Sequence, residues 1–352
     1  MLHPVGDRIA YPRDVRRIIR KDVRGDYLRT ANALNRSVDV VSVQHEYGIW
    51  GGEDGDTVLD FVQALRVPVV VTMHTVLRNP TPHQRSVLSK LAALAEASVV
   101  MSRSAADLLV REYSVDPARL HVIPHGVPDV PLVDANLVKP GLGLAGRDVV
   151  LSFGLLGPGK GYELAIDALP EVVAAHPAVL YVILGATHPD LIRRDGEAYR
   201  ESLIEQAQRL GMADHVRFVD RFVGLIELTH WLQAADVVVT PYPNLGQIVS
   251  GTLSYAMGAG RAIVSTPYVY AAELLADGRG VLAEPGSPAA LAAAVGSLVG
   301  DRALRAEIGR RAFACSRRMV WSAVGAEYRS LFARLASGSV RATASPAVLI
   351  GA

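Results

Sequence analysis

The stretch Asp148–Pro170, DVVLSFGLLGPGKGYELAIDALP, decides how the rest of the chain is interpreted. It opens with Val149–Phe153, a short apolar run that is typical of a buried strand. Glycines, among them Gly157 and Gly159, then break the pattern, and from Tyr162 apolar residues recur at helical spacing. The stretch therefore predicts a strand, a glycine loop and a helix. This arrangement directs backbone N–H groups and the positive end of a helix dipole at a ligand above the loop.

Lys160 lies in this loop and adds a full positive charge, so the pattern favours a phosphate or diphosphate ligand. The loop matches neither the GxGxxG motif nor the GxxxxGK[ST] motif of P-loop proteins. An ordinary turn between strand and helix with a solvated lysine would have the same spacing, because such loops are often glycine-rich. The spacing alone leaves both interpretations open.

Length and composition narrow the class of protein. The 352 residues favour two domains, and 50% hydrophobic with 20% charged residues suit a globular protein with a sizeable core. The net charge of +1 gives no overall field that would attract nucleic acid. Cys315 is the single cysteine, which excludes an intrachain disulfide and favours a cytoplasmic location. The first residues lack the apolar core of a signal peptide, and no apolar run is long enough to predict a transmembrane segment.

Predicted strands alternate with predicted helices along the whole chain, which indicates an α/β fold with parallel, doubly wound sheets. The strands are expected at Val38–Gln44, Val67–Thr72, Ser98–Met101, His121–Pro124, Val149–Phe153, Val179–Leu184, Val216–Phe218, Val237–Thr240 and Ala262–Ser265. The arginine-rich residues 1–30 are interpreted as a surface helix or a disordered arm. Residues 129–147 are rich in Pro, Gly and Val and are predicted to be a linker, and residues 337–352 are predicted to be a frayed tail.

Polar side chains follow the first two predicted strands. His45, Glu46, Tyr47 and Trp50 come directly after the first strand, and His74 follows the second. Because ligands of open α/β sheets bind beyond the carboxyl ends of the strands, we expect a site in a cleft between the two halves. Structural roles remain open for these residues. Glu46 would then accept nearby N–H groups, His74 would be a buried hydrogen-bonded histidine and Trp50 a core aromatic.

Several motifs, in the expected order, resemble those of the family 4 glycosyltransferases, which are retaining enzymes with the GT-B fold. The motifs are MHT at 73–75, VIPHGVPD at 122–129, FGLLGPGKGYELAIDAL at 153–169 and SYAMGAGRAIVSTPYVYAAELLADG from Ser254. The resemblance covers residues 38–336. HEYGIWGG and PHGVPDV are similar to a bacterial, mannosyltransferase-like subset in which GDP-mannose is a plausible donor.

This resemblance implies two Rossmann-like domains that face a cleft. Residues 1–128 would form an acceptor-side domain, 148–318 a nucleotide-sugar-binding domain, and 319–336 a helix that returns to the first domain. The family's first strand and its glycine loop have no match here. The resemblance therefore implies a first domain that is shortened at its N-terminus.

The resemblance also implies roles for individual residues. Lys160 would pair with the donor diphosphate, His74 would contact the donor sugar near the reaction centre, and Glu273 would lie beside the nucleotide. His45, Tyr47 and Trp50 are assigned to the acceptor side, and His74 and Glu46 are the candidate catalytic residues. No metal or cofactor is implied, since a lysine, loop N–H groups and a helix N-terminus can carry the leaving-group charge. We find no DxD motif in a plausible loop and no cluster of His or Cys ligands in the sequence.

The chain departs from the family pattern at the donor site. Leu155 stands where the family has an arginine, and Arg221 is the candidate substitute. Gln247 and Tyr255 replace the family's paired glutamates. Gln247 keeps donors and acceptors for sugar hydroxyls, whereas Tyr255 lacks a carboxylate for the ribose.

A further helix N-terminus is predicted at the donor site. Its N–H groups would come from Ser250, Gly251 and Thr252. The expected function is retaining transfer of a hexose from a nucleotide diphosphate sugar to a hydroxyl of a carbohydrate or other acceptor. A GT-B protein that binds nucleotide sugars with little turnover is the alternative. A GT-B epimerase or phosphorylase also stays open, although the lysine motif that a pyridoxal-dependent phosphorylase needs is not found.

Overall fold

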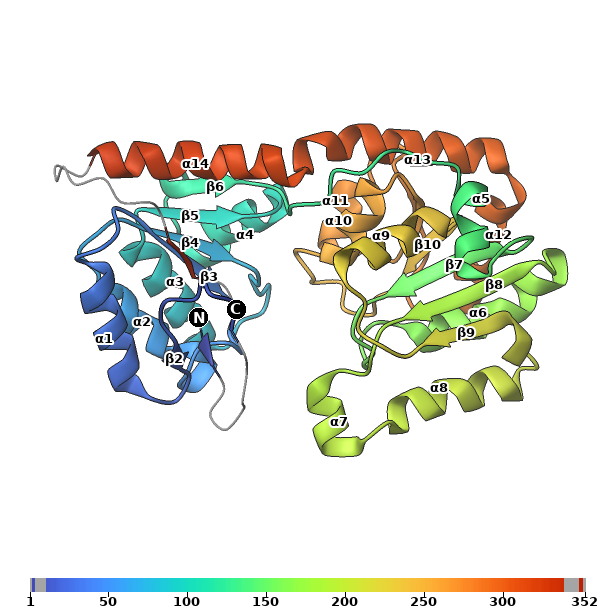
Figure 1. Ribbon diagram of the computed structural model, residues 1–352, viewed down its shortest axis with the longest axis horizontal. Helices are drawn as coiled ribbons and strands as arrows, with labels where there is room; N and C mark the ends of the chain where they lie inside the picture. The colour runs from blue at the N-terminus through green and yellow to red at the C-terminus, as the bar shows by residue number, and fades with distance from the viewer. Residues whose placement is uncertain (1, 4–10, 339–347, 351–352) are drawn as a thin grey trace. The chain divides into compact units, whose positions relative to one another are not determined.

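The computed structural model describes residues 2–3, 11–338 and 348–350, and the chain divides into two compact units (Figure 1). We call Met1–Pro124 with Val324–Ala352 the N-terminal unit and His125–Ala323 the C-terminal unit. Each is built on a parallel sheet with helices packed against it, as the alternation of strands and helices predicts.

The N-terminal unit contains a five-stranded sheet in the order β13-β3-β4-β5-β6. All of its pairings are parallel. Every residue of β4, VVVTM, is buried, as expected for a strand that is covered on both faces. The strands of this unit are β1 (Leu2–His3), β2 (Ile19–Arg20), β3 (Val41–His45), β4 (Val69–Met73), β5 (Ala97–Val100), β6 (Leu120–Val122) and β13 (Val348–Ile350).

The helices of the N-terminal unit are α1 (Arg24–Leu34), α2 (Thr57–Gln63), α3 (Pro82–Leu94), α4 (Arg103–Tyr113) and α14 (Trp321–Gly338), which extends beyond this unit at its start. Figure 1 shows α14 running along β5 and β6. Val324 and Leu331 of α14 are buried in one cluster with Val70 and Val99 of the sheet. Tyr328 adds a hydrogen bond of 3.0 Å to the hydroxyl of Thr72. The last helix is therefore part of the core of this unit.

Two terminal segments differ from the sequence-based expectation. Within residues 1–30 the structure places the short pair β1–β2 and the start of α1, rather than one surface helix or an arm. Within the predicted tail, Val348–Ile350 forms β13 and pairs with β3. Three residues give too short a pattern to indicate a strand, and only the free edge of β3 supplies the pairing partner.

The C-terminal unit contains a six-stranded parallel sheet in the order β12-β11-β10-β7-β8-β9. The chain leaves β7 toward β8 on one side and leaves β10 toward β11 on the other, so the strand order reverses between β7 and β10. The strands are β7 (Asp148–Phe153), β8 (Val179–Leu184), β9 (Val216–Val219), β10 (Val237–Thr240), β11 (Ala262–Ser265) and β12 (Val281–Leu282).

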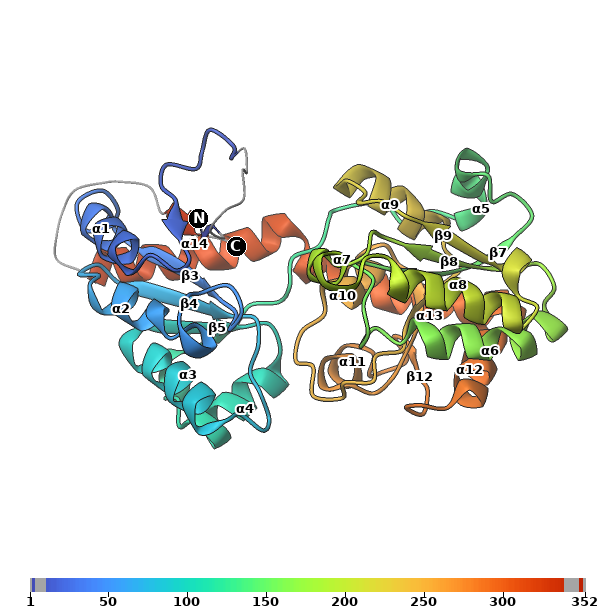
Figure 2. The same cartoon turned by 90° about the horizontal axis from the view of Figure 1, so that it is seen from below.

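Helices cover both faces of this sheet (Figure 2). One apolar cluster joins the sheet to α6, α8 and α12, and a second joins it to α9, α10 and α11. The helices are α5 (Ala135–Val138), α6 (Tyr162–Ala175), α7 (Pro189–Asp195), α8 (Ala198–Arg209), α9 (Leu225–Ala234), α10 (Gly251–Gly258), α11 (Val269–Leu274), α12 (Pro288–Gly300) and α13 (Arg302–Ser316).

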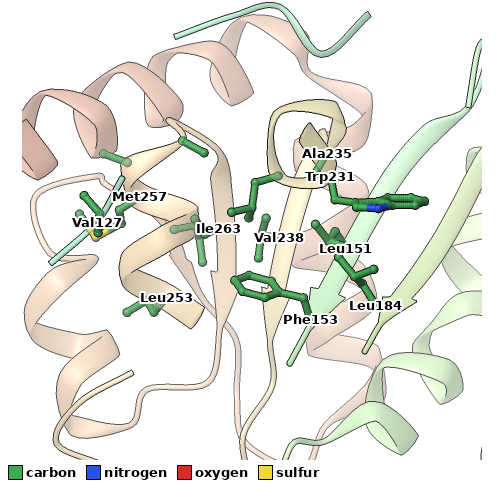
Figure 3. Close-up of a cluster of buried hydrophobic side chains, with 14 of the residues drawn as sticks. Val127, Leu151, Phe153, Leu184, Trp231, Ala235, Val238, Leu253, Met257 and Ile263 are labelled. Atoms are coloured by element: carbon green, nitrogen blue, oxygen red, sulfur yellow. The ribbon is translucent and has the colours of Figure 1, made fainter. Parts of the chain in front are cut away.

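Figure 3 shows the second cluster, in which side chains of neighbouring strands meet α10. Leu151, Val238 and Ile263 come from three adjacent strands, and Leu253 and Met257 come from α10. All five are fully buried. Burial of this apolar surface fixes α10 against the sheet and so sets where its N-terminus lies.

Candidate functional site

The glycine loop lies at the point where the strand order of the C-terminal sheet reverses. Such a point is where open α/β sheets bind ligands, beyond the carboxyl ends of the strands. The loop that follows β10 passes directly against it, because a Cβ on Gly161 would lie 2.0 Å from the carbonyl oxygen of Pro241. Gly161 also has φ +71°, so glycine is required here for both conformation and space. The sequence predicts this loop correctly. The structure shows in addition that the loop after β10 packs against it at Pro241.

Lys160 contacts an aromatic ring instead of a carboxylate. Its Nζ lies 4.6 Å from the centroid of the Tyr242 ring, and Tyr242 stacks on Tyr268 with centroids 5.3 Å apart and an interplanar angle of 14°. Burial lowers the pKa of Lys160. Among the described residues no ion pair to Lys160 occurs. Its charge is therefore held in place by a cation–π contact while it remains uncompensated.

Tyr242 and Tyr268 follow the carboxyl ends of β10 and β11, within segments that the sequence places at the ligand-binding ends of the strands. The sequence pattern assigns neither tyrosine a role of its own, because their stacking on one another appears only in the fold. The side chain of Tyr242 is buried with its hydroxyl beside Ser250 and Thr252. Tyr242 thus connects the glycine loop to the start of α10.

The start of α10 is the second helix N-terminus at this edge of the sheet. Ser250 caps the helix, and its Oγ accepts a hydrogen bond of 3.2 Å from the N–H of Leu253. Gly251 and Thr252 follow in the first turn and are partly exposed. Gln247 lies in the loop before the cap, where its Nε2 donates to the carbonyl of Val249 at 2.8 Å. The predicted donor residues Lys160, Gln247 and Ser250–Thr252 thus all lie on loops or helix starts at the carboxyl ends of the strands.

Three other predicted donor residues occupy different positions. Arg221 follows the edge strand β9, with β8 between it and β7, and it is exposed and paired with Glu227 at 2.7 Å. Glu273 is half-buried in the last turn of α11. Tyr255 lies on α10, and its ring packs against that of His125 at 5.9 Å. The fold therefore does not bring Arg221 next to Lys160, and its role as a substitute for the family arginine stays a prediction.

In the N-terminal unit the predicted polar residues pair with one another at the ends of β3 and β4. His74 Nε2 lies 2.8 Å from Gln44 Oε1, and its backbone N–H donates to the carbonyl of His45 at 3.0 Å. The hydroxyl of Thr75 donates to Glu46 Oε2 at 2.5 Å. The structure thus brings His74 and Glu46 to one edge of one sheet, as the sequence predicts from their positions after the strands.

His45 and Trp50 are buried, which corrects their predicted acceptor-side role. Trp50 is 1% exposed, packs between Tyr27 and Phe61, and donates through Nε1 to the carbonyl of Gln44 at 3.1 Å. Its ring is a core aromatic and has no free face on which a sugar could stack. His45 is fully buried with neither ring nitrogen hydrogen-bonded. Burial first, and the neighbouring His74 second, lower the pKa of His45 to about 4.

Tyr47 stays partly exposed at this edge. Its ring meets that of His45 edge to face at 5.2 Å, and its backbone N–H donates to Glu46 Oε1 at 3.0 Å. Burial is the main cause of a strongly raised pKa for Tyr47, so its hydroxyl stays protonated. Of the three residues assigned to the acceptor side, Tyr47 is the one that can still offer a group to a ligand of this unit.

The N-terminal unit also holds a polar cluster that the sequence analysis missed. Glu53, Asp54 and His83 place one potential metal-ligand atom each within 4.8 Å of one another. This group contains one histidine and no cysteine, so the expectation of no His or Cys ligand cluster and no metal stays a prediction. Asp54 and His83 are 29 residues apart in the sequence, which hides their proximity. His83 and Gln84 occupy the two oxygens of Asp54 at 3.0 and 3.1 Å. These bonds join η1 (Glu53–Gly55) to the start of α3.

Two family models match the chain, one in each unit. Residues 4–129 match the model described as "Glycosyltransferase Family 4", and residues 147–301 match "Glycosyl transferases group 1". The chain belongs to the family 4 glycosyltransferases. The family resemblance read from the motifs is thereby confirmed, and both models match where the two α/β units lie.

Curated relatives of this family 4 member include two kinds of inositol-directed enzyme. A D-inositol 3-phosphate glycosyltransferase of Xylanimonas cellulosilytica is 31% identical over 76% of this chain and 66% of the relative. A phosphatidyl-myo-inositol mannosyltransferase of Mycolicibacterium smegmatis is 28% identical over 81% of this chain and 70% of the relative. The chain thus spans about two thirds of the length of the curated relatives that it matches.

Solved structures with the same fold include Anabaena HepE in complex with UDP, with a TM-score of 0.72 at 20% identity over 88% of this chain and 82% of that one. Sucrose-phosphate synthase of Thermosynechococcus elongatus gives 0.70 at 18% identity, over 90% and 78%. These neighbours confirm the predicted GT-B fold class. In the described ranges, no helix has both the length and the apolar character needed to cross a bilayer.

Proposed function

We propose that this chain transfers a sugar from a nucleotide diphosphate sugar to an acceptor hydroxyl with retention at the anomeric carbon. The observation that carries the proposal is the partly buried charge of Lys160, which makes no ion pair with a described residue and lies in a glycine loop where the strand order reverses. A cation without a carboxylate partner, beside two helix N-termini, is suited to a diphosphate.

The proposed chemistry follows from this charge distribution. The donor diphosphate would lie over Gly157–Lys160 and against the start of α10. As the anomeric C–O bond breaks, its electron pair goes to the diphosphate, where Lys160 and backbone N–H groups stabilise the negative charge. The acceptor oxygen then bonds to the anomeric carbon from the same face. The departing phosphate oxygen takes the acceptor proton, so no protein carboxylate has to act as nucleophile.

The sugar itself would be held by hydrogen-bonding side chains. Gln247 offers an amide that can both donate to and accept from sugar hydroxyls, and the family resemblance assigns His74 to the donor sugar. Both side chains are already hydrogen-bonded in this structure, His74 to Gln44 and Gln247 to the carbonyl of Val249. For Glu46 we propose a supporting role at the N-terminal unit's edge, because Thr75 and the backbone of Tyr47 occupy its two oxygens.

For the donor we propose GDP-mannose first and UDP-glucose second. The mannose proposal rests on the family resemblance and on the mannosyltransferase of M. smegmatis among the relatives. UDP-glucose comes second on the family resemblance, and Anabaena HepE, a neighbour of the same fold, was solved in complex with that ligand. We also propose a cytoplasmic location, which rests on the single cysteine and the apolar pattern of the sequence.

A nucleotide-release assay on the purified chain tests this function. Each nucleotide sugar is supplied with candidate hydroxyl acceptors, and free nucleotide diphosphate and the anomeric configuration of the product are measured. We expect release that survives excess EDTA, because the proposed charge partners are a lysine and backbone N–H groups. Binding of a nucleotide sugar without release would favour the alternative of a binding protein. Loss on chelation with recovery on adding Mg²⁺ or Mn²⁺ would contradict the metal-independent mechanism.

A further inference from the structure

A charged cavity lies at the amino ends of the strands of the C-terminal sheet, whereas the glycine loop follows a carboxyl end. It has a volume of about 300 Å³ and lies at the amino ends of β10 and β11, which begin just after Asp236 and Arg261. Its other arginines, Arg302, Arg305 and Arg310, come from α13. None of the residues proposed for the donor site lines this cavity.

The buried charges in and behind the cavity wall do not balance. Lys139 Nζ lies 2.5 Å from Asp236 Oδ2, and Arg305 lies 3.3 Å from the other oxygen of the same carboxylate. Arg261 is a third cation here and is 6% exposed, whereas Arg305 is partly buried. Asp236 is thus the single buried carboxylate for these three cations, and Asp134, the other aspartate of the lining, is exposed. A buried charge without a counter-charge is costly, so this group favours an anion nearby.

Arg261 keeps its full charge although its donors are satisfied. Its guanidinium donates to four backbone carbonyl oxygens, those of Ala259, Gln233, Ala235 and Val133. Carbonyl oxygens supply only partial negative charge. Burial lowers the pKa of Arg261 to about 10, which leaves the group protonated at neutral pH. Its charge therefore adds to the field inside the cavity.

Two further arginines stand at the exposed rim. The side chain of Arg302 makes no ion pair or hydrogen bond with any residue that the structure describes. Arg310 pairs with Glu307 at 2.7 Å, but both side chains are exposed, and such pairs contribute little and exchange readily. Against the four lining arginines stand two lining aspartates, Asp134 and Asp236, so the formal charge of the lining is +2.

We propose that this cavity binds a small phosphorylated anion, either pyrophosphate or the phosphate ester of a small sugar. The planar guanidinium groups of arginine match the geometry of phosphate oxygens and keep their charge at all physiological pH values. The volume lies at the lower end of the range for ligand pockets, which excludes a whole nucleotide sugar. The site is separate from the glycine loop and would let the concentration of a phosphorylated metabolite act on the enzyme.

The test is calorimetric titration of the full chain with pyrophosphate, a hexose 6-phosphate and inorganic phosphate, each at the same ionic strength. Lys160→Ala serves as the background, because pyrophosphate could also bind at the glycine loop. The double variant Arg302→Gln with Arg310→Gln removes the two rim cations, and neither is a core residue. Arg311→Gln is the matched control, since Arg311 lies on the same helix and also pairs with Glu307 but does not line the cavity.

We expect binding in the Lys160→Ala background that weakens at least about tenfold in the double variant and is unchanged in the control. Comparison of the three ligands tells which phosphate chemistry the cavity prefers. The proposal is overturned if Lys160→Ala abolishes all binding, or if the double variant binds as tightly as its parent. It is also overturned if sodium chloride at the same ionic strength gives the same heats.

Discussion

The two units place different chemistry at the carboxyl ends of their sheets. In the C-terminal unit Lys160 faces the Tyr242 ring and keeps an uncompensated charge. In the N-terminal unit Glu46 and His74 are already hydrogen-bonded, to Thr75 and Gln44. The same sheet architecture therefore yields one set of strand ends with a cation that lacks an ion-pair partner and another set whose polar side chains are hydrogen-bonded to one another. The proposed stabilisation of the leaving group therefore rests on the charge of Lys160 in the C-terminal unit.

Removal of the lysine charge should give the largest effect. Lys160→Ala should lower the rate of nucleotide release roughly a hundredfold or more, because a desolvated charged contact to phosphate is lost. Circular dichroism and the melting temperature should stay near wild type, since Lys160 is only partly buried. Wild-type turnover in this variant would contradict the proposal that the charge of Lys160 stabilises the leaving group.

Tyr242 tests whether the aromatic ring positions the lysine. Tyr242→Leu should lower kcat/KM about tenfold by loss of the cation–π contact, whereas Tyr242→Phe keeps the ring and should recover most of the activity. Tyr242→Leu should also move the alkaline limb of the pH–rate profile, because burial holds the pKa of Lys160 below its ordinary value. If the leucine and phenylalanine variants behave alike, the ring has no such role.

Gln247 tests whether a side chain next to the start of α10 binds the donor sugar. Gln247→Ala should lose most turnover because hydrogen bonds to sugar hydroxyls disappear, and Gln247→Glu should be tolerated or faster, because a carboxylate supports an oxocarbenium ion better than an amide. The measurement is kcat with one donor at saturation. Full activity in Gln247→Ala would place the sugar elsewhere.

The smallest expected effect is on stability. It concerns the pH dependence that the buried His45 of the N-terminal unit should cause. Above about pH 6.5 its ring is neutral in both folded and unfolded chains. As the pH falls toward 4, the unfolded chain takes up a proton that the folded chain does not, because the folded pKa is lowered to about 4. Stability should therefore decrease across this window by up to about 3 kcal/mol.

Denaturant unfolding between pH 4 and 7 measures this effect. His45→Leu should flatten the pH dependence, since an apolar side chain fits a site in which neither ring nitrogen is hydrogen-bonded. His188→Gln, at an exposed histidine, is the control and should keep the wild-type slope. An unchanged slope in His45→Leu would show that other groups cause the pH dependence.

Local patterns in the sequence predicted most of the fold, because its strands are buried apolar runs and its glycine loop interrupts one of them. Features that depend on distant residues were missed or misassigned. Trp50 was assigned to a sugar because nothing nearby in the sequence shows that Tyr27 and Phe61 enclose it. The Tyr242–Tyr268 stack unites loops after two different strands. Only the folded chain brings these residues together.

The arginine cavity illustrates the same limit. Its lining comes from the segments 132–136, 235–236, 260–262 and 302–310, none of which carries a recognisable motif. The excess of positive charge in the cavity becomes visible only in the fold, where Asp236 pairs with both Lys139 and Arg305. The net charge of the whole chain, +1, does not indicate this local excess.

The most direct test of the central claim is a thermal-shift comparison of wild type and Lys160→Ala with GDP, UDP, ADP and dTDP sugars. We predict that one class of nucleotide sugar raises the melting temperature of the wild type at ligand concentrations well above micromolar values. The same ligand should give little or no shift in the variant. An equal shift in both proteins, or no shift in the wild type with any of the four classes, would contradict the claim that the glycine loop and Lys160 hold a donor diphosphate.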